Sequence, residues 1–138
     1  MLKTSGIVCS TRRWIYLSCD EELGNYYRSL AKAYLLNLKC DYNNKMWPKL
    51  HQPTWRTHLS IVRLEDFESL SRETIFQYWN KWDGQEVEIE YMPGILSNGL
   101  YFWLSVKDNE QLSQIRLTLG LSKNPSYAYH ITIGNLVE

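Results

Sequence analysis

The sequence has few cysteines, few prolines and no long run of apolar residues. Its cysteines, Cys9, Cys19 and Cys40, are odd in number and lack a C-x-x-C spacing, so we expect neither a disulfide framework nor a structural zinc site. Nowhere do 18 apolar residues follow one another, and the first residues lack the apolar region of a secretory signal. We therefore expect a soluble cytoplasmic protein with reduced thiols and no membrane contact.

An excess of charge of either sign is also missing. Fifteen Lys and Arg residues balance fifteen Asp and Glu residues, so the chain has no general attraction to duplex nucleic acid, and we expect no duplex DNA partner. Aromatic residues, by contrast, are abundant at 14%, with six Trp and ten Tyr. Such rings stack on unpaired bases, or fill a core or an interface, and composition leaves these roles open.

Length and periodicity indicate one α+β domain over residues 1–138. The 138 residues are enough to bury roughly 65–70% of the surface that the unfolded chain exposes. Period-two alternation predicts strands over residues 14–18, 55–63, 86–91, 100–106 and 127–133. Helical spacing and capping residues predict helices over residues 21–38, 67–82 and 109–119. Strands that follow one another without a helix between them disfavour a doubly wound parallel sheet, which leaves a mixed α+β arrangement.

Two of these predicted strands carry a histidine followed two residues later by a hydroxyl residue. Residues 57–63 read THLSIVR, and residues 126–135 read SYAYHITIGN. Because side chains alternate along a strand, His58 shares a face with Ser60, and His130 shares a face with Thr132. Such a pattern follows a histidine by chance about once in twenty, yet two of three histidines carry it. The competing interpretation is two structural histidines on unrelated strands.

If the two strands lie side by side, these groups suit the cleavage of a phosphodiester. One imidazole accepts a proton from the attacking oxygen, and the other donates a proton to the leaving oxygen. Hydroxyl groups hold the nonbridging oxygens. His58 and His130 are therefore the candidate catalytic residues, and Ser60 and Thr132 the candidate phosphate-binding residues. Which histidine is the acid stays open.

Two other functional classes compete with this interpretation. A metal hydrolase is disfavoured, because no carboxylate stands at ligand spacing from either histidine, and the acid and base pair requires neither a metal nor another cofactor. A non-catalytic nucleotide-binding module would keep the groove without turnover.

The third histidine, His51, lacks the pattern and falls in residues 41–53, which hold two prolines and are expected to form a loop.

Further substrate contacts are expected from residues around the two motifs. Tyr16 and Trp103 lie on the non-core faces of their strands, where a ring can stack on a base. Arg56 shares a face with His58 and carries a planar fork that matches phosphate. The remaining candidates are Tyr27, Arg28 and Trp55. For Tyr27 the competing interpretation is a helix face that packs on the sheet.

The segments THLSIV and YHITIG resemble the paired His-x-Ser/Thr motifs of the 2H phosphoesterase superfamily, whose members cleave cyclic or 2′-linked nucleotide phosphodiesters without metal. The segments ELGNYYR, GLYFWLSV and NPSYAYHITIGN, and a Pro-x-Trp before HLSIVR, resemble the compact members carried by tailed phages. The resemblance extends over most of the chain. It implies two pseudo-symmetric lobes of mostly antiparallel strands, with helices outside and a cleft between them.

The resemblance also implies roles and a substrate class. His58 and His130 would act as acid and base, and Ser60 and Thr132 would bind phosphate. Some phage members cleave the cyclic oligonucleotide messengers of bacterial anti-phage signalling, so a cyclic oligonucleotide is the expected substrate. If the protein is phage-encoded, the expected location is the host cytoplasm. RNA ends bearing a 2′,3′-cyclic phosphate, or 2′–5′ linked RNA, are the alternative substrates.

Overall fold

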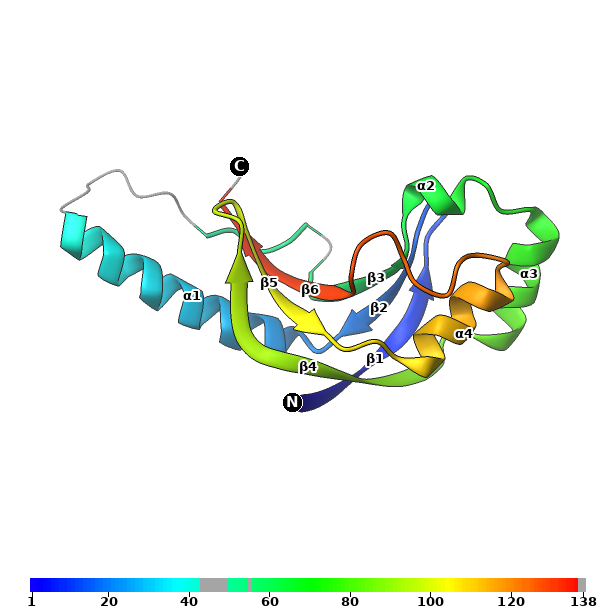
Figure 1. The fold of residues 1–138 in the computed structure, drawn as a ribbon, viewed down its shortest axis with the longest axis horizontal. Coiled ribbons are helices and arrows are strands. Elements are labelled where there is room, and N and C mark those ends of the chain that lie inside the picture. The colour runs from blue at the N-terminus through cyan, green and yellow to red at the C-terminus, as the bar shows by residue number, and fades with distance from the viewer. Residues whose placement is uncertain (43–49, 55, 137–138) are drawn as a thin grey trace.

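The computed structural model describes residues 1–42, 50–54 and 56–136, and within them the fold is α+β, as predicted (Figure 1). The strands are β1 (Leu2–Ser10), β2 (Ile15–Cys19), β3 (His58–Val62), β4 (Glu86–Ser97), β5 (Tyr101–Val106) and β6 (His130–Asn135). The helices are α1 (Glu21–Tyr42), α2 (Leu64–Phe67), α3 (Arg72–Lys81) and α4 (Glu110–Thr118).

The strands form one closed antiparallel barrel in the order β1-β2-β3-β6-β5-β4, which β1 closes by pairing with β4. Strands β3 and β6 are therefore neighbours, although residues 63–129 separate them in the chain. Figure 1 shows α1 at the left of the barrel and α3 and α4 at the right. The two predicted histidine strands thus lie side by side in the sheet.

The chain order repeats itself around the β3–β6 pair. A hairpin, a helix and a strand follow one another twice, first as β1-β2-α1-β3 and then as β4-β5-α4-β6. The helices are exchanged between these halves, because α1 packs against β6 and α4 packs against β3. Strands β3 and β6 therefore occupy equivalent positions, which makes their histidines equivalent as well.

Two buried arginines mark this equivalence. Arg28 of α1 donates from Nε to the carbonyl oxygen of Ile133 at 3.1 Å, and Arg116 of α4 donates from a terminal nitrogen to that of Ile61 at 2.9 Å. Each isoleucine stands three residues after a motif histidine. Buried charged groups require such hydrogen bonds, so each arginine fixes a helix of one half onto the histidine strand of the other half.

Strand β1 was not predicted, because its sequence LKTSGIVCS alternates poorly. Only Gly6 and Val8 of the strand are buried. The strand is specified by its partners instead, since β2 pairs along residues 6–10 and β4 pairs along residues 2–7. Hydrogen bonding to two neighbours forms this strand without the hydrophobic alternation that a sequence-based prediction requires.

Element boundaries differ from the predictions at several further places. The helix predicted over residues 67–82 is divided into α2 and α3, and the Ser71 hydroxyl caps α3 by accepting from the Thr74 amide at 3.2 Å. Strand β4 continues past Pro93 and Gly94 to Ser97, with its register shifted between Tyr91 and Ile95. Proline is tolerated in a strand at such an irregularity. Strand β6 begins at His130 rather than at residue 127.

Tyrosine burial predicts a loss of stability at alkaline pH. Burial raises the pKa of Tyr27 from 10.0 to about 12, and its ring packs edge-on against Tyr91 with centroids 6.0 Å apart. A group whose pKa is raised in the folded state stabilises the fold below its ordinary pKa and loses that contribution as the pH rises. The urea midpoint should therefore fall between pH 10 and pH 12.

Matched variants at neighbouring tyrosines isolate this effect. Tyr27→Phe removes the titrating hydroxyl, so its urea midpoint should fall less steeply over that window than that of the wild type. Tyr26→Phe is the control, because Tyr26 stands beside it in α1 with 60% of its surface exposed. An equally steep decline in wild type and Tyr27→Phe would contradict the assignment.

Candidate active site

The strand register brings the two sequence motifs together on one face. Leu59 of β3 pairs with Ile131 of β6 in an antiparallel ladder, and both side chains are 0% exposed. In the same register His58 lies across from Thr132, and Ser60 lies across from His130. These four side chains point to the opposite face from the two buried ones and are half-buried.

This arrangement fixes the spacing of the two imidazoles. Residues directly across an antiparallel pair have Cβ atoms roughly 4.5–5.5 Å apart, and diagonal neighbours roughly 7–8 Å or somewhat less. His58 and His130 are diagonal neighbours, whereas each histidine faces a hydroxyl residue of the other strand directly. The register therefore brings two imidazoles and two hydroxyls to neighbouring positions on one face of the sheet.

The two histidines are held in the same way. Nδ1 of His58 lies 3.0 Å from the carbonyl oxygen of Arg56, and Nδ1 of His130 lies 3.0 Å from that of Ala128. A carbonyl oxygen only accepts hydrogen bonds, so Nδ1 carries a proton in both rings. Nε2 is therefore the atom of each ring that can gain and lose a proton.

Arg56 supports His58 through its backbone. Its φ is 60°, a left-handed conformation that is unfavourable for a residue with a Cβ atom, and its amide donates to the Pro53 carbonyl oxygen at 3.0 Å. This turn presents the carbonyl oxygen of Arg56 to the imidazole. Its side chain is exposed, so a phosphate contact through the guanidinium, as predicted from the sequence, stays a prediction.

The residue before His58 is anchored to the start of α1. Thr57 is 2% exposed, and both its amide and its hydroxyl donate to the Glu21 carboxylate, at 2.9 and 3.3 Å. Gly24 permits this close approach, because a Cβ atom there would lie 2.0 Å from the Thr57 hydroxyl oxygen. The first turn of α1 thus fixes where β3, and with it the catalytic candidate, begins.

Aromatic side chains stand beside each histidine at equivalent positions. Tyr16 of β2 pairs with Ser60, and Trp103 of β5 pairs with Thr132. The Trp103 ring lies 6.5 Å from the His130 ring. Both aromatics predicted to stack on a base are therefore next to the four-residue site, which consists of His58, Ser60, His130 and Thr132.

Trp14, which the sequence did not single out, completes the surroundings of His58. Its ring stacks on Tyr16 with centroids 4.1 Å apart, and it lies edge-on to His58 at 4.9 Å. Its indole Nε1 donates to the Ser60 hydroxyl oxygen at 3.1 Å. Because an indole N–H only donates, the Ser60 oxygen accepts, and the hydroxyl hydrogen is directed to another acceptor. Trp14 thereby orients Ser60 as a donor.

Several cavities border the site, and two of them are together called the groove. The first, of about 670 Å³, is the basic arm, and the residues that define it are Arg12, Arg13, Trp14, His58, Ser60 and Arg63. The second, of about 590 Å³, is the aromatic arm, and the residues that define it are Asn98, Tyr101, Trp103, Tyr127, His130 and Thr132. Arg63 borders both arms and lies over the Tyr127 ring at 4.5 Å. His58 and Ser60 therefore border the basic arm, and His130 and Thr132 border the aromatic arm.

Two of the predicted substrate contacts lie elsewhere. Tyr27 is 5% exposed in the hydrophobic core, and Arg28 is buried with its Nε on the Ile133 carbonyl oxygen. The side chain of Ile133 is on the buried face of β6, opposite to His130, and α1 packs against that strand. The expectation that Tyr27 and Arg28 bind substrate is therefore corrected, since both hold α1 on the barrel. Trp55 lies outside the described residues.

His51 is attached to the end of β6. Its amide donates to the Asn135 carbonyl oxygen at 2.7 Å, and the Asn135 amide donates back at 3.0 Å. A Cβ atom at Gly134 would lie 2.9 Å from the Leu50 side chain, so this segment crosses β6 closely. His51 does not line either arm of the groove as described.

Within residues 1–42, 50–54 and 56–136, no group of three or more His, Cys, Asp or Glu side chains is placed to hold a metal ion. In the same part of the chain, none of the helices has the length and apolar character needed to cross a membrane. The chain matches no protein-family model, no curated protein and no solved structure. Function therefore has to be inferred from the geometry of the groove.

Proposed function

We propose that this protein is a metal-independent phosphodiesterase of the 2H phosphoesterase type, with His58 and His130 as general acid and base. The observation that carries the proposal is the β3–β6 register, which pairs each histidine with a hydroxyl residue of the other strand. The repeated hairpin-helix-strand order supports the two-lobed arrangement that this superfamily implies. Phosphodiester cleavage uses all four groups together.

In the proposed reaction, Nε2 of one neutral imidazole takes a proton from the attacking water. The water oxygen forms a bond to phosphorus, and the bond between phosphorus and the leaving oxygen breaks. Nε2–H of the second, protonated imidazole supplies the proton to that leaving oxygen. The products are a phosphomonoester and a free hydroxyl group, and the two rings return to their starting states by proton exchange with water.

The hydroxyl residues stabilise the charge that develops on the nonbridging oxygens. Ser60 is oriented as a donor by the Trp14 indole, and Thr132 stands directly across from His58 in the register. Donors fixed in advance cost little reorganisation when the charge appears. In both rings, a backbone carbonyl oxygen accepts a hydrogen bond from Nδ1. This bond stabilises the imidazolium in whichever ring is protonated.

The groove favours a substrate with a base on each side of the scissile phosphate. Trp14 and Tyr16 stand on one side of the site, and Trp103 stands on the other. A cyclic di- or oligonucleotide, such as the signals of bacterial anti-phage defence, would use both arms, and this is our preferred substrate class. An RNA end with a 2′,3′-cyclic phosphate or a 2′–5′ linkage is the alternative. A phage-encoded protein of this type would act in the host cytoplasm.

Product formation in EDTA tests the proposal. The wild-type protein is incubated with cyclic dinucleotides, cyclic trinucleotides, 2′–5′ linked oligoadenylates and 2′,3′-cyclic mononucleotides, and products are separated by chromatography. We expect at least one of these to be hydrolysed at the same rate with and without EDTA. Binding without any turnover would favour a non-catalytic nucleotide-binding module, and activity lost in EDTA would indicate a metal hydrolase.

A further inference from the structure

The two arms of the groove differ in charge. Among the described residues that line the basic arm, Arg12, Arg13 and Arg63 stand against one carboxylate, Glu65. Those that line the aromatic arm include Arg63 but neither a second arginine nor a carboxylate. Since the whole protein has zero formal net charge, this concentration of arginines is a local feature on one side of the histidines.

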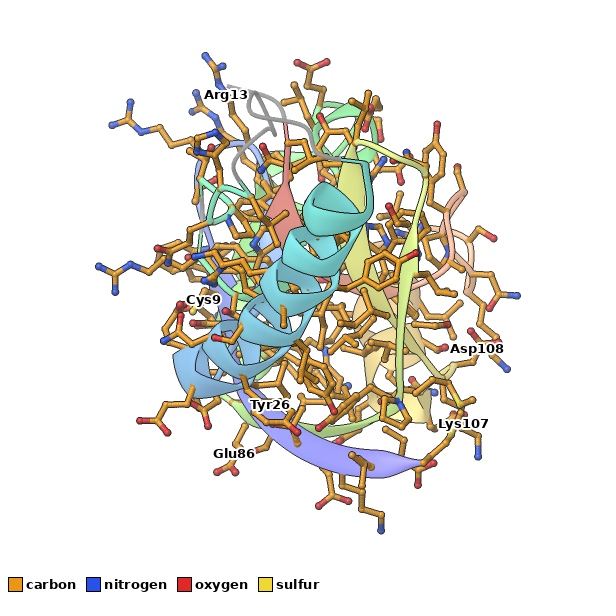
Figure 2. The ribbon with its side chains drawn as sticks, turned by 90° about the vertical axis from the view of Figure 1, so that its left-hand side faces the viewer. Cys9, Arg13, Tyr26, Glu86, Lys107 and Asp108 are labelled. Atoms are coloured by element: carbon orange, nitrogen blue, oxygen red, sulfur yellow. The ribbon has the colours of Figure 1, made fainter. Side chains whose placement is uncertain are left out.

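The β1–β2 hairpin places two of these arginines beyond the ring that contacts His58. The Thr11 amide donates to the Trp14 carbonyl oxygen at 2.8 Å, and the Arg13 amide donates to the Thr11 hydroxyl oxygen at 3.2 Å. These bonds close a tight turn whose tip is Arg12 and Arg13, both exposed. Figure 2 shows the Arg13 side chain extending from the ribbon at the upper left. Trp14 therefore separates the arginines from the four-residue site.

The order of groups along the arm matches the order of groups in an oligonucleotide. The histidines and hydroxyls would hold one phosphate, the Trp14 ring, stacked on Tyr16, offers a face for a base or sugar, and Arg12 and Arg13 follow. Arginine presents a planar fork that binds phosphate oxygens in pairs. The next charged group of an oligonucleotide beyond its nucleoside is another phosphate.

We propose that the basic arm is a subsite for a second phosphate, one nucleotide away from the scissile one, bound by Arg12 and Arg13. This subsite rests on the proposed phosphodiesterase function and narrows its substrate class. Cyclic dinucleotides, cyclic trinucleotides and oligonucleotides with two or more phosphates fill it. A 2′,3′-cyclic mononucleotide leaves it empty.

A pair of cyclic dinucleotides isolates the second phosphate. The first is cyclic diadenylate, and the second is the same molecule with one of its two phosphates replaced by an uncharged methylphosphonate. For the wild type, we expect kcat/KM to be about tenfold or more lower for the methylphosphonate analogue, as for loss of a charge-assisted hydrogen bond. As the salt concentration rises, the rate with cyclic diadenylate should also fall more steeply than the rate with the methylphosphonate analogue.

The double variant Arg12→Ala/Arg13→Ala tests whether the arginines of the β1–β2 hairpin cause the preference for cyclic diadenylate over its methylphosphonate analogue. Both side chains are exposed, and thermal melting checks that the fold is kept. We expect the ratio of kcat/KM for the two substrates to fall from about tenfold toward equality. Arg72→Gln is the matched control, because Arg72 is an exposed arginine in the first turn of α3, and it should keep the wild-type ratio.

The outcomes separate this inference from the proposed function. Equal kcat/KM for the two cyclic dinucleotides, a preference retained by Arg12→Ala/Arg13→Ala, or turnover confined to 2′,3′-cyclic mononucleotides would overturn the second-phosphate subsite and leave the phosphodiesterase intact. No hydrolysis of any phosphodiester in the panel would overturn both.

Discussion

Replacing either His58 or His130 by alanine should lower kcat on the preferred substrate by about 10²–10⁴-fold, with EDTA present throughout. Each ring has its own proton transfer in the proposed reaction, and each is held by an equivalent Nδ1 hydrogen bond of 3.0 Å. Initial rates of product release measure the effect. The double variant should be little worse than either single variant, because the two transfers belong to one reaction step.

His51→Gln is the matched control for the histidine variants. His51 is the third histidine of the chain, and it is attached to Asn135 outside both arms of the groove. It should retain the wild-type kcat. A kcat equal to that of the wild type in His58→Ala or His130→Ala would contradict the two-histidine mechanism, whatever the substrate.

Removing the Thr132 hydroxyl should lower kcat by about 10²-fold, the usual cost of losing one donor to a developing oxyanion. Thr132→Val is nearly isosteric and keeps the β-branched shape, whereas Thr132→Ser keeps the hydroxyl. We therefore expect Thr132→Ser to restore most of the activity that Thr132→Val loses. KM should change much less than kcat, because the bond is strongest in the transition state.

The valine and serine variants also separate chemistry from folding. Thr132 is half-buried next to Trp103 in the β5–β6 ladder, so a shape change would affect both substitutions through the strand. Equal activity in wild type and Thr132→Val would show that the hydroxyl does not contact the reacting phosphate. Equal losses in Thr132→Ser and Thr132→Val would indicate a structural role for the residue.

Strand parity predicted the shared face of each motif but not the contact between motifs. The alternation around Leu59 and Ile131 is local, so the sequence alone showed that His58 accompanies Ser60 and that His130 accompanies Thr132. Which strands become neighbours depends on hydrogen bonds between distant segments. The β3–β6 pairing therefore appears only in the folded structure.

Residues in turns were the least predictable part of the groove. Arg12 and Arg13 lie between β1 and β2, so neither period-two nor helical spacing singles them out, and Arg63 was predicted only as the last residue of a strand. Adjacent arginines in a turn are also common on solvated surfaces. Their position relative to the histidines follows from the β1–β2 hairpin and from the end of β3, which is information about the fold rather than the local sequence.

Helix α1 shows the opposite error. Tyr27 and Arg28 were chosen as candidate substrate contacts because their side chains suit bases and phosphates, yet a helix presents several faces and only its partner decides which one is buried. The exchange of helices between the halves places Arg28 against β6, and the Tyr27 ring packs on Tyr91 of β4. A buried arginine bound to a strand carbonyl oxygen has a structural role, and Arg116 provides the same bond in the other half.

A crystal structure with orthovanadate bound in the groove tests the account most directly. We expect one vanadate ion with oxygens about 2.7–3.2 Å from Nε2 of both His58 and His130, and with the hydroxyls of Ser60 and Thr132 on its other oxygens. A vanadate ion held by only one histidine, or imidazole rings turned into separate environments, would contradict the shared phosphate site.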